Sequence, residues 1–134
     1  MRVVLDTNVV VSGLLSPHGP PGQILSLAIT GVLTVLWDDR IAAEYREVTA
    51  RPRFAFDQRR AAAVLAALVA GGELIGAEPL PIVLPDPDDG PFLEVAAAGR
   101  ADALVTGNVP HFRPVHGRHR VRVLTPAQVL DALR

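Results

Sequence analysis

The sequence predicts an α/β fold in which helices cover both faces of a central, mostly parallel sheet, as a three-layer α/β/α sandwich. Short apolar runs alternate with helical segments along the whole chain, and such an alternation favours parallel strands joined by crossover helices. The 134 residues with 49% apolar content suit one globular domain spanning residues 1–134, and there is no linker, internal repeat or low-complexity segment.

The first half of the chain contains two predicted strands and three predicted helical segments. Each strand is a short apolar run, and the helices are bounded by capping residues, by proline at a first helical position or by glycine just past the end. In order, we expect a strand at Arg2–Leu5, a turn into helix, a helix from about Pro21 to just before Gly31, a strand at Leu33–Trp37, and a helix capped by Asp38 or Asp39 that runs to about Thr49.

The second half contains the remaining three predicted strands. Asp57 can cap a helix with one apolar face that ends at Gly71-Gly72, and Thr125 can cap a last helix in which Pro126 takes the first position. Between them we expect a strand at Ile82–Leu84, a helix at Phe92–Ala98, and strands at Ala103–Thr106 and Val121–Leu124, with the last helix ending at Leu133.

Acidic and amide residues follow the predicted strands. Asp6 follows the first strand, the run from Asp86 to Asp89 follows the third, and Asn108 follows the fourth. Loops that leave the carboxyl ends of parallel strands gather at one edge of a sheet, where ligands bind. Glu44 lies early enough in the helix after the second strand to reach this edge. We therefore expect four separate segments to bring oxygen ligands together.

This set of residues predicts a Mg²⁺ or Mn²⁺ site. Carboxylates forced together repel one another unless a cation neutralises them, and hard divalent ions prefer oxygen ligands. Cysteine is absent, and none of the four histidines forms the helical His-Glu-x-x-His pattern of a zinc hydrolase. An open, acid-lined edge that holds one ion, or two, suits phosphodiester hydrolysis by activated water.

Each of these residues also has a purely structural interpretation. Asp6 could simply start a turn, Glu44 could be a solvated helix residue, and Asp86 or Asp88 could only shape a loop or cap a helix. Asn108 could be a turn residue in the left-handed conformation. Thr7 and Asn8 favour a functional site at Asp6, because they add polar side chains to an otherwise apolar run.

The charge pattern leaves nucleic-acid binding open. Net charge is −1, so affinity for nucleic acid would have to come from local patches. All thirteen basic residues are arginine, and two clusters could be such patches or solvated faces: Arg51, Arg53, Arg59 and Arg60, and Arg113, Arg118, Arg120 and Arg122. No apolar stretch approaches the ~20 residues that cross a bilayer, so we expect no membrane association and a cytoplasmic location.

With these residues in place, the chain resembles the PIN (PilT N-terminus) domain family, and within it the small single-domain toxins of type II toxin–antitoxin systems. The resemblance covers almost the whole chain and depends on the order and spacing of four motifs. They are Val3-Val4-Leu5-Asp6-Thr7-Asn8; Ala43-Glu44-Tyr45 with Arg51-Pro52-Arg53-Phe54 after it; Asp86-Pro87-Asp88-Asp89 before Phe92-Leu93-Glu94; and Ala101 to Asn108.

The resemblance implies a compact nuclease in which acids bind Mg²⁺ or Mn²⁺ and cleave RNA. It implies that Asp6, Glu44 and Asp89 are the catalytic metal ligands. Asn108 falls where many members have a fourth acid, and its amide can coordinate through the carbonyl but contributes no charge. Further residues would orient ligands or the scissile phosphate: Thr7, Asn8 and Thr106, with Glu94 as a possible outer-sphere participant.

The resemblance also implies partners, namely an RNA substrate and a cognate antitoxin protein that holds the toxin inactive. The leucine- and alanine-rich surface permits a homodimer. Two rival functions stay open. One is a phosphohydrolase of the haloacid dehalogenase type, which would need an aspartate at position 8 and a lysine that the chain lacks; the other is a catalytically lapsed PIN-fold interaction module.

Overall fold

The protein is an α/β/α sandwich built on a five-stranded sheet in which every neighbouring pair of strands is parallel. The computed structural model describes residues 1–115 and 118–134. The strands lie in the order β3-β2-β1-β4-β5, so the first strand of the chain is central. This confirms the fold class predicted from the alternation of strands and helices.

The described elements follow the chain in a regular βα order. They are β1 (Arg2–Leu5), α1 (Thr7–Leu15), α2 (Pro20–Ile29), β2 (Thr34–Trp37), α3 (Asp39–Thr49), α4 (Gln58–Gly71), β3 (Glu73–Leu74), a 3₁₀ turn (Pro87–Asp89), α5 (Gly90–Ala98), β4 (Ala103–Val105), α6 (Val109–Phe112), two further 3₁₀ turns (Arg113–Val115 and Arg118–Arg120), β5 (Val123–Leu124) and α7 (Pro126–Ala132).

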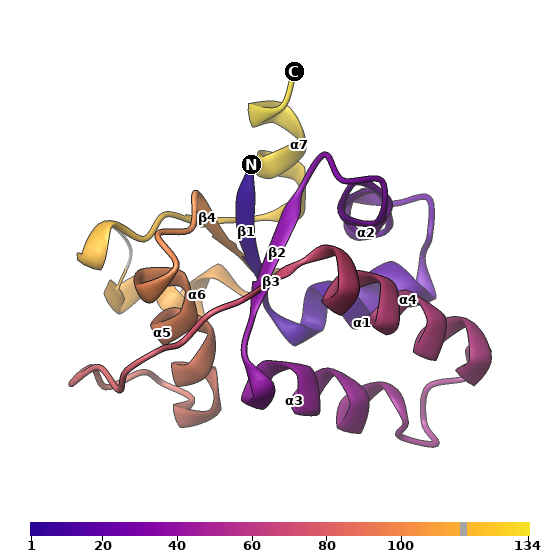
Figure 1. Ribbon diagram of the computed structural model, residues 1–134, viewed down its shortest axis with the longest axis horizontal. Coiled ribbons are helices and arrows are strands. Elements are labelled where there is room, and N and C mark those ends of the chain that lie inside the picture. The colour runs from indigo at the N-terminus through magenta and orange to yellow at the C-terminus, as the bar shows by residue number, and fades with distance from the viewer. Residues whose placement is uncertain (116–117) are drawn as a thin grey trace.

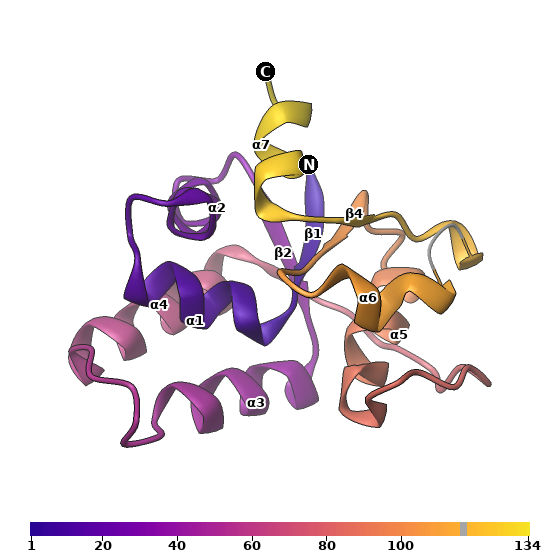
Figure 2. The same cartoon turned by 180° about the vertical axis from the view of Figure 1, so that it is seen from behind.

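The helices form two layers around the sheet. Helices α1 to α4 gather on one side of the strands, and α5 and α6 lie on the other side (Figure 1). The view from behind shows the same division, with α7 beside the amino end of β1 (Figure 2). Helix α5 packs against β1, β2 and β4, and α7 packs against α2 and β4.

The register between β1 and β4 sets the geometry of one edge of the sheet. Leu5 pairs with Val105, so the residues that follow the two strands, Asp6 and Thr106, are neighbours although 100 residues separate them. The backbone N–H of Asp6 donates to the Val105 carbonyl at 2.9 Å, which continues the ladder by one residue. The carboxyl edge therefore begins with these two polar residues.

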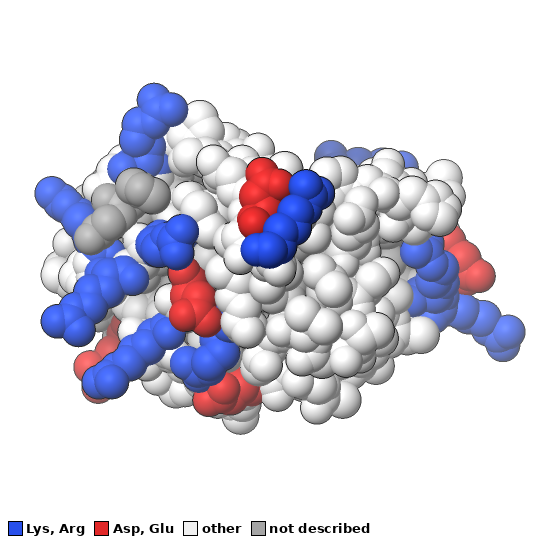
Figure 3. Space-filling model, turned by 90° about the horizontal axis from the view of Figure 1, so that it is seen from above, with Lys and Arg blue, Asp and Glu red and all other residues white. Residues whose placement is uncertain are grey.

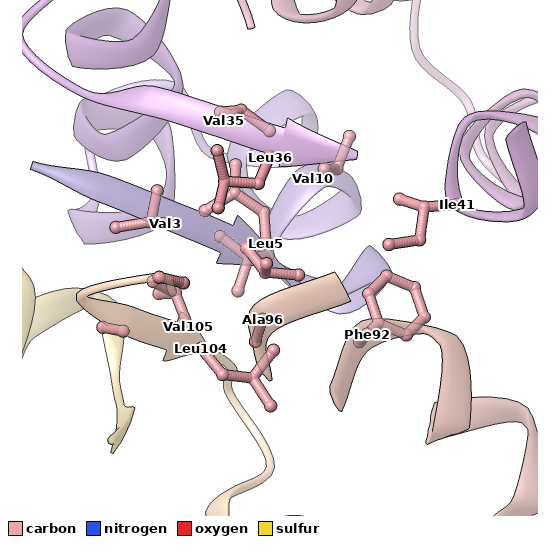
Figure 4. Packing of buried hydrophobic residues seen from close by; sticks show 14 of the residues in the cluster. Val3, Leu5, Val10, Val35, Leu36, Ile41, Phe92, Ala96, Leu104 and Val105 are labelled. Atoms are coloured by element: carbon pink, nitrogen blue, oxygen red, sulfur yellow. The ribbon is translucent and has the colours of Figure 1, made fainter. Parts of the chain in front are cut away.

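A continuous apolar core holds this edge in place. The three strand residues Val3, Val4 and Leu5 are fully buried, as expected for a central strand covered on both faces. Side chains of β1, β2 and β4 meet Phe92 and Ala96 of α5 in the core (Figure 4). Because the strands pack on both sides, their ends are rigidly placed.

The capping residues predicted from the sequence cap the helices. Asp38, and not Asp39, caps α3, since its side chain accepts from the Ile41 N–H at 3.0 Å. Asp57 accepts from two N–H groups at the start of α4. Thr125 forms a capping box with Gln128 at the start of α7. Most other predicted ends differ from the observed ones by one or two residues, which is ordinary fraying at element ends.

The strand predicted at Ile82–Leu84 was wrong. The third strand is instead Glu73–Leu74, which follows α4 directly and pairs with Leu36 and Trp37 of β2. Residues 75–84 contain no strand, and Val83 is 91% exposed. The apolar run failed to form a strand because prolines at positions 79, 81 and 85 lack the N–H that a ladder needs.

The segment at residues 75–84 instead crosses α5 as an extended strap. The Leu80 N–H donates to a carboxylate oxygen of Glu94 at 3.0 Å, and Leu84 is buried in the core. Asp86 to Asp89 therefore reach the carboxyl edge through this strap and a 3₁₀ turn, and not by leaving a third strand as predicted. The short helix α6 was also not predicted.

Candidate metal centre

Asp6 directly follows β1 at the carboxyl edge, and its side chain belongs to a network of polar contacts. It is 7% exposed, and its Oδ2 accepts a hydrogen bond from the Thr106 hydroxyl at 2.7 Å. It occupies the N-cap position of α1, but among the described residues its side chain accepts no capping hydrogen bond. Burial raises the pKa of Asp6, and the Thr106 hydroxyl partly offsets this. The backbone N–H groups of Thr7 and Asn8 also lower this pKa, so the carboxylate lies against the start of α1 as well as against Thr106.

Thr106 and Asn8 join the loop after β4 to the start of α1. The fully buried Thr106 hydroxyl accepts from the Asn108 N–H at 3.0 Å, and the Asn8 amide lies 3.5 Å from it. Asn8 Oδ1 in turn accepts from the Gly107 N–H at 3.1 Å. The structure therefore brings two of the predicted orienting residues, Asn8 and Thr106, into direct contact with each other and one of them with Asp6.

Asn108 lies at the N-cap position of α6, next to this network. Its backbone has φ −123° and ψ 68°, so the alternative interpretation as a left-handed turn residue is wrong. It is partly buried, and its side chain does not cap α6 within the described chain. Its amide is thus not committed to the helix end.

Glu44 reaches the same edge from α3. Its carboxylate accepts a hydrogen bond from the Thr7 hydroxyl, which belongs to the residue directly after Asp6. Burial raises the pKa of Glu44, the Thr7 hydroxyl lowers it, and the negative charge of Asp6 raises it further. The interpretation of Glu44 as a merely solvated helix residue is therefore wrong.

Tyr45 anchors α3 beside β1. Its ring is fully buried, and its hydroxyl donates to the carbonyl of Leu5. Burial raises the pKa of the Tyr45 phenol well above its ordinary value, with Asp6 and Glu44 adding to the shift. The phenol is therefore neutral, and the hydrogen bond positions the turn of α3 that carries Glu44.

Asp89 ends the 3₁₀ turn before α5 and is 8% exposed. Its Oδ2 is buried, and among residues 1–115 and 118–134 it has no hydrogen-bond partner. Burial, together with the negative charges of Asp6 and Asp86, raises the pKa of Asp89 to about 6. A buried carboxylate oxygen with no donor is costly unless something else neutralises it.

Asp86 and His111 complete the group around Asp89. One oxygen of Asp86 accepts from the Asp88 N–H at 2.9 Å and so shapes the turn. Asp86, Asp89 and His111 each offer a ligand atom within 4.8 Å of the others. The sequence prediction missed His111. The available signal was its position three residues after Asn108, in the loop that leaves β4.

An ion-pair clamp holds the two acid-bearing helices together. Arg40 on α3 pairs with Glu94 on α5 at 2.7 Å and with Asp38 at 2.8 Å. Because the second Glu94 oxygen accepts from the strap at Leu80, both oxygens are engaged. Glu94, predicted as a possible outer-sphere participant, therefore positions the strap and the helices.

The carboxyl edge thus collects acids from three distant parts of the chain. The PIN domain family model matches residues 2–110. The chain belongs to the PIN domain family. The match includes Asp6, Glu44, Asp89 and Asn108 and ends one residue before His111.

Two known proteins are similar to this PIN domain. The uncharacterized protein MJ1680 of Methanocaldococcus jannaschii is 29% identical over 111 residues, which are 81% of this chain and 71% of that protein. The crystal structure of VapBC2 from Rickettsia felis, bound to a DNA fragment from its promoter, superposes with a TM-score of 0.62 at 17% identity. That match covers 93% of this chain and 98% of the other. At this identity the likeness shows a shared fold.

The donor set of this PIN domain fits a divalent cation. Burial raises the pKa of Asp6, Glu44 and Asp89, the charge of Asp6 adds to the shift at the other two, and His111 offsets only part of the shift at Asp89. A divalent ion would supply the missing positive charge, and carboxylates suit Mg²⁺ and Mn²⁺. The acid cluster is therefore a candidate metal centre.

Three arginines of the cluster Arg113, Arg118, Arg120 and Arg122 lie apart from this centre. Arg118, Arg120 and Arg122 are exposed and precede β5, which puts them at the amino edge of the parallel sheet, opposite the acids. The face that carries both termini shows arginine side chains gathered on the side of α5 and α6 (Figure 3). In the other cluster, Arg51 pairs with Glu47 at 2.9 Å. Three members of one cluster thus lie at the edge opposite the acids, and one member of the other cluster forms a local ion pair.

None of the helices in the described part of the chain is long and apolar enough to cross a membrane.

Proposed function

We propose that this PIN domain is a metal-dependent endoribonuclease that hydrolyses phosphodiester bonds in RNA. The observation that carries the proposal is the convergence of Glu44 of α3 and Asp89 of the turn before α5 on Asp6 at the end of β1, where the negative charge of Asp6 adds to burial in raising the pKa of both. Such a group is unfavourable without a cation, and retained unfavourable clusters are typical of functional sites.

In this proposal Asp6, Asp89 and Glu44 hold Mg²⁺ or Mn²⁺, and Asn108 contributes through its carbonyl oxygen. When bound, the cation would activate a water and neutralise charge at the scissile phosphate. Thr106 and Thr7 donate hydrogen bonds to Asp6 and Glu44 and so fix the orientation of both carboxylates. Asn8 holds the loop after β4 in the same arrangement.

Asn108 lowers the negative charge of the site by one relative to a carboxylate at that position. A second cation should therefore bind more weakly than the first. The site would work with one ion until a substrate phosphate supplies the missing charge. Single-stranded RNA, whose phosphates are accessible along the chain, fits this requirement.

The proposed biological role is that of a toxin held inactive by an antitoxin protein in the cytoplasm. Its support is the fold shared with VapBC2 and the family membership. The homodimer stays a prediction. The toxin proposal is tested by inducing the chain in cells: growth should stop, and Asp6→Asn should restore it.

The nuclease activity is tested with purified protein, Mn²⁺ or Mg²⁺, and a labelled single-stranded RNA. Wild type should cut it, Asp6→Asn and Asp89→Asn should reduce the rate by at least about 100-fold, and Asp131→Asn should match wild type. Asp131 is a suitable control because its side chain is 72% exposed on α7. Cleavage that survives Asp6→Asn unchanged would mean that a contaminant or another site is responsible.

A second candidate is an interaction module whose catalysis has lapsed, which the amide at Asn108 favours. Calorimetry separates the two. A lapsed centre should show no Mn²⁺ binding that depends on Asp6 and Asp89, whereas a nuclease should show at least one such site.

A further inference from the structure

We propose that His111, with Asp86 and Asp89, supplies an imidazole ligand to the cation at the carboxyl edge and makes the site selective for Mn²⁺ over Mg²⁺. The proposal depends on the part of the proposed function that places a cation among these acids. It does not depend on RNA cleavage.

The geometry of the three side chains supports a shared ion. A ligand atom of each lies within 4.8 Å of the others, and His111 Nδ1 lies 3.3 Å from Asp89 Oδ2. That spacing leaves room for one cation to contact all three, since ligands on a common ion are separated by roughly 3 to 4 Å at first-row bond lengths of about 2.0–2.2 Å.

The buried oxygen of Asp89 is the independent sign of a ligand. Asp89 is 8% exposed, and its Oδ2 has no hydrogen-bond partner in the described parts of the chain, even though His111 is close. His111 Nδ1, 3.3 Å from this oxygen, lowers the pKa of Asp89 but does not offset the cost of its burial. A cation held by both would satisfy that oxygen, whereas a simple ion pair of this geometry leaves it unsatisfied.

The local fold holds His111 at this position. Phe112, the next residue, is fully buried, and the His111 N–H donates to the Asn108 carbonyl at 3.1 Å. The short helix α6 is thus anchored in the core at one end and tied to the loop after β4 at the other. The His111 side chain is 43% exposed, which leaves the ion open to water and substrate.

The chemistry of the ligand set gives the selectivity. Mg²⁺ strongly prefers oxygen ligands and keeps several waters, so an imidazole adds little to its binding. Imidazole nitrogen suits first-row transition ions better than it suits Mg²⁺. Mn²⁺ is the weakest binder of that series and is well suited to carboxylates, but as a transition ion it gains more from an added nitrogen ligand than Mg²⁺ does. Asn108 is neutral as well. The residues from the loop after β4, Asn108 and His111, therefore offer the cation an amide oxygen and a ring nitrogen in place of a negative charge.

The first experiment measures Mn²⁺ and Mg²⁺ binding separately by calorimetry, with the full chain and no RNA. Loss of an orienting partner alone typically weakens metal binding about 10- to 100-fold, so His111→Ala should cost at least about tenfold in Mn²⁺ affinity. Mg²⁺ affinity should stay the same within error. His111→Gln tests the same point with a side chain that keeps more of the packing, and thermal denaturation checks that both variants fold.

His18→Ala is the matched control, because His18 is an exposed histidine in the connection between α1 and α2. It should bind both ions as wild type does. An equal loss of Mn²⁺ and Mg²⁺ affinity in both His111 variants would overturn the selectivity claim. Unchanged Mn²⁺ affinity would overturn the ligand claim and leave His111 as an ion-pair partner of Asp89.

A spectroscopic measurement tests coordination directly. Protein labelled with ¹⁵N-histidine and loaded with Mn²⁺ should show a nitrogen coupling in electron spin-echo spectra, and this coupling should vanish in His111→Ala but persist in His18→Ala. No nitrogen coupling in the wild type would refute the proposal. If RNA stays uncut while the coupling is present, the nuclease proposal fails and this one stands; RNA cleavage without the coupling gives the reverse result.

Discussion

Removing the charge of Asp89 should stabilise the metal-free protein. The Asp89 side chain is 11% exposed, Asp6 and Asp86 repel it, and His111, 3.3 Å from its Oδ2, offsets only part of this cost. Asp89→Asn keeps the shape of the side chain and removes this charge. The residue occupies the N-cap position of α5 without a capping hydrogen bond from its side chain among the described residues, so the substitution does not remove a cap.

The size of the effect follows from the pKa of Asp89, which is raised from 3.8 to about 6. Each pKa unit corresponds to about 1.4 kcal/mol, so ionising Asp89 in the folded state costs at most about 3 kcal/mol, and solvent screening and the shared titration with neighbouring acids reduce this cost. The folded pKa lies above the unfolded one, so this cost is absent below about pH 4, grows as the pH rises, and is complete above about pH 6. Wild type should therefore lose stability with rising pH relative to Asp89→Asn.

The assay is urea denaturation in a metal chelator at pH 4.5, 6 and 8, with Asp131→Asn as control. Asp89→Asn should be more stable than wild type by about 1–3 kcal/mol at pH 8, and the difference should shrink toward zero at the lowest pH. Asp131→Asn should track wild type at every pH. A variant that is less stable than wild type at pH 8, or a difference that does not change with pH, would refute the reasoning.

Three further substitutions test the scaffold of the site, each by urea denaturation. Gly72→Ala should destabilise by about 1–3 kcal/mol, because a Cβ there would lie 2.3 Å from a β2 carbonyl oxygen, while Gly71→Ala, with nothing within 4 Å, should not. Tyr45→Phe should cost about 1 kcal/mol through loss of its buried hydrogen bond. Thr106→Val should cost about 1–3 kcal/mol, since Asp6 and a backbone N–H both lose their partner.

The fold could be predicted because local signals and the global pattern agree over most of the chain. Caps at Asp38, Asp57 and Thr125 mark helix starts by a chemistry that does not depend on tertiary contacts. The exception is the region after α4. There, Glu73–Leu74 is a two-residue strand with both residues exposed, so neither burial nor alternation could mark it.

The same region shows why an apolar run can mislead. Ile82–Leu84 has the composition of a buried strand, yet only Leu84 is buried, and the prolines around it prevent ladder pairing. The run packs as a strap over α5 instead. The sequence shows that the run is apolar, but only the tertiary structure shows which element packs against it.

The residues of the site that follow paired strands could be predicted from the sequence. Those that an irregular backbone positions could not. Asp6 and Thr106 follow paired central strands, so parallel topology alone makes them neighbours. Asp89 and His111 reach the edge through a 3₁₀ turn and a four-residue helix, neither of which has a periodic signal. Their proximity could be learned only from the three-dimensional structure.

Asp6 and Glu44 accept hydrogen bonds from hydroxyl groups, whereas the buried oxygen of Asp89 does not in the described part of the chain. This difference indicates at which acid a bound cation should stabilise the protein most. Asp6 and Glu44 each accept a hydroxyl hydrogen bond, from Thr106 and Thr7, which lowers the cost of their burial. The buried Oδ2 of Asp89 has no such donor within the described residues. A bound ion should therefore contribute most of its stabilisation at Asp89. Asp89→Asn should therefore raise the free energy of unfolding when a chelator removes the metal. When Mn²⁺ is present, the variant should lack most of the stabilisation that the ion gives the wild type.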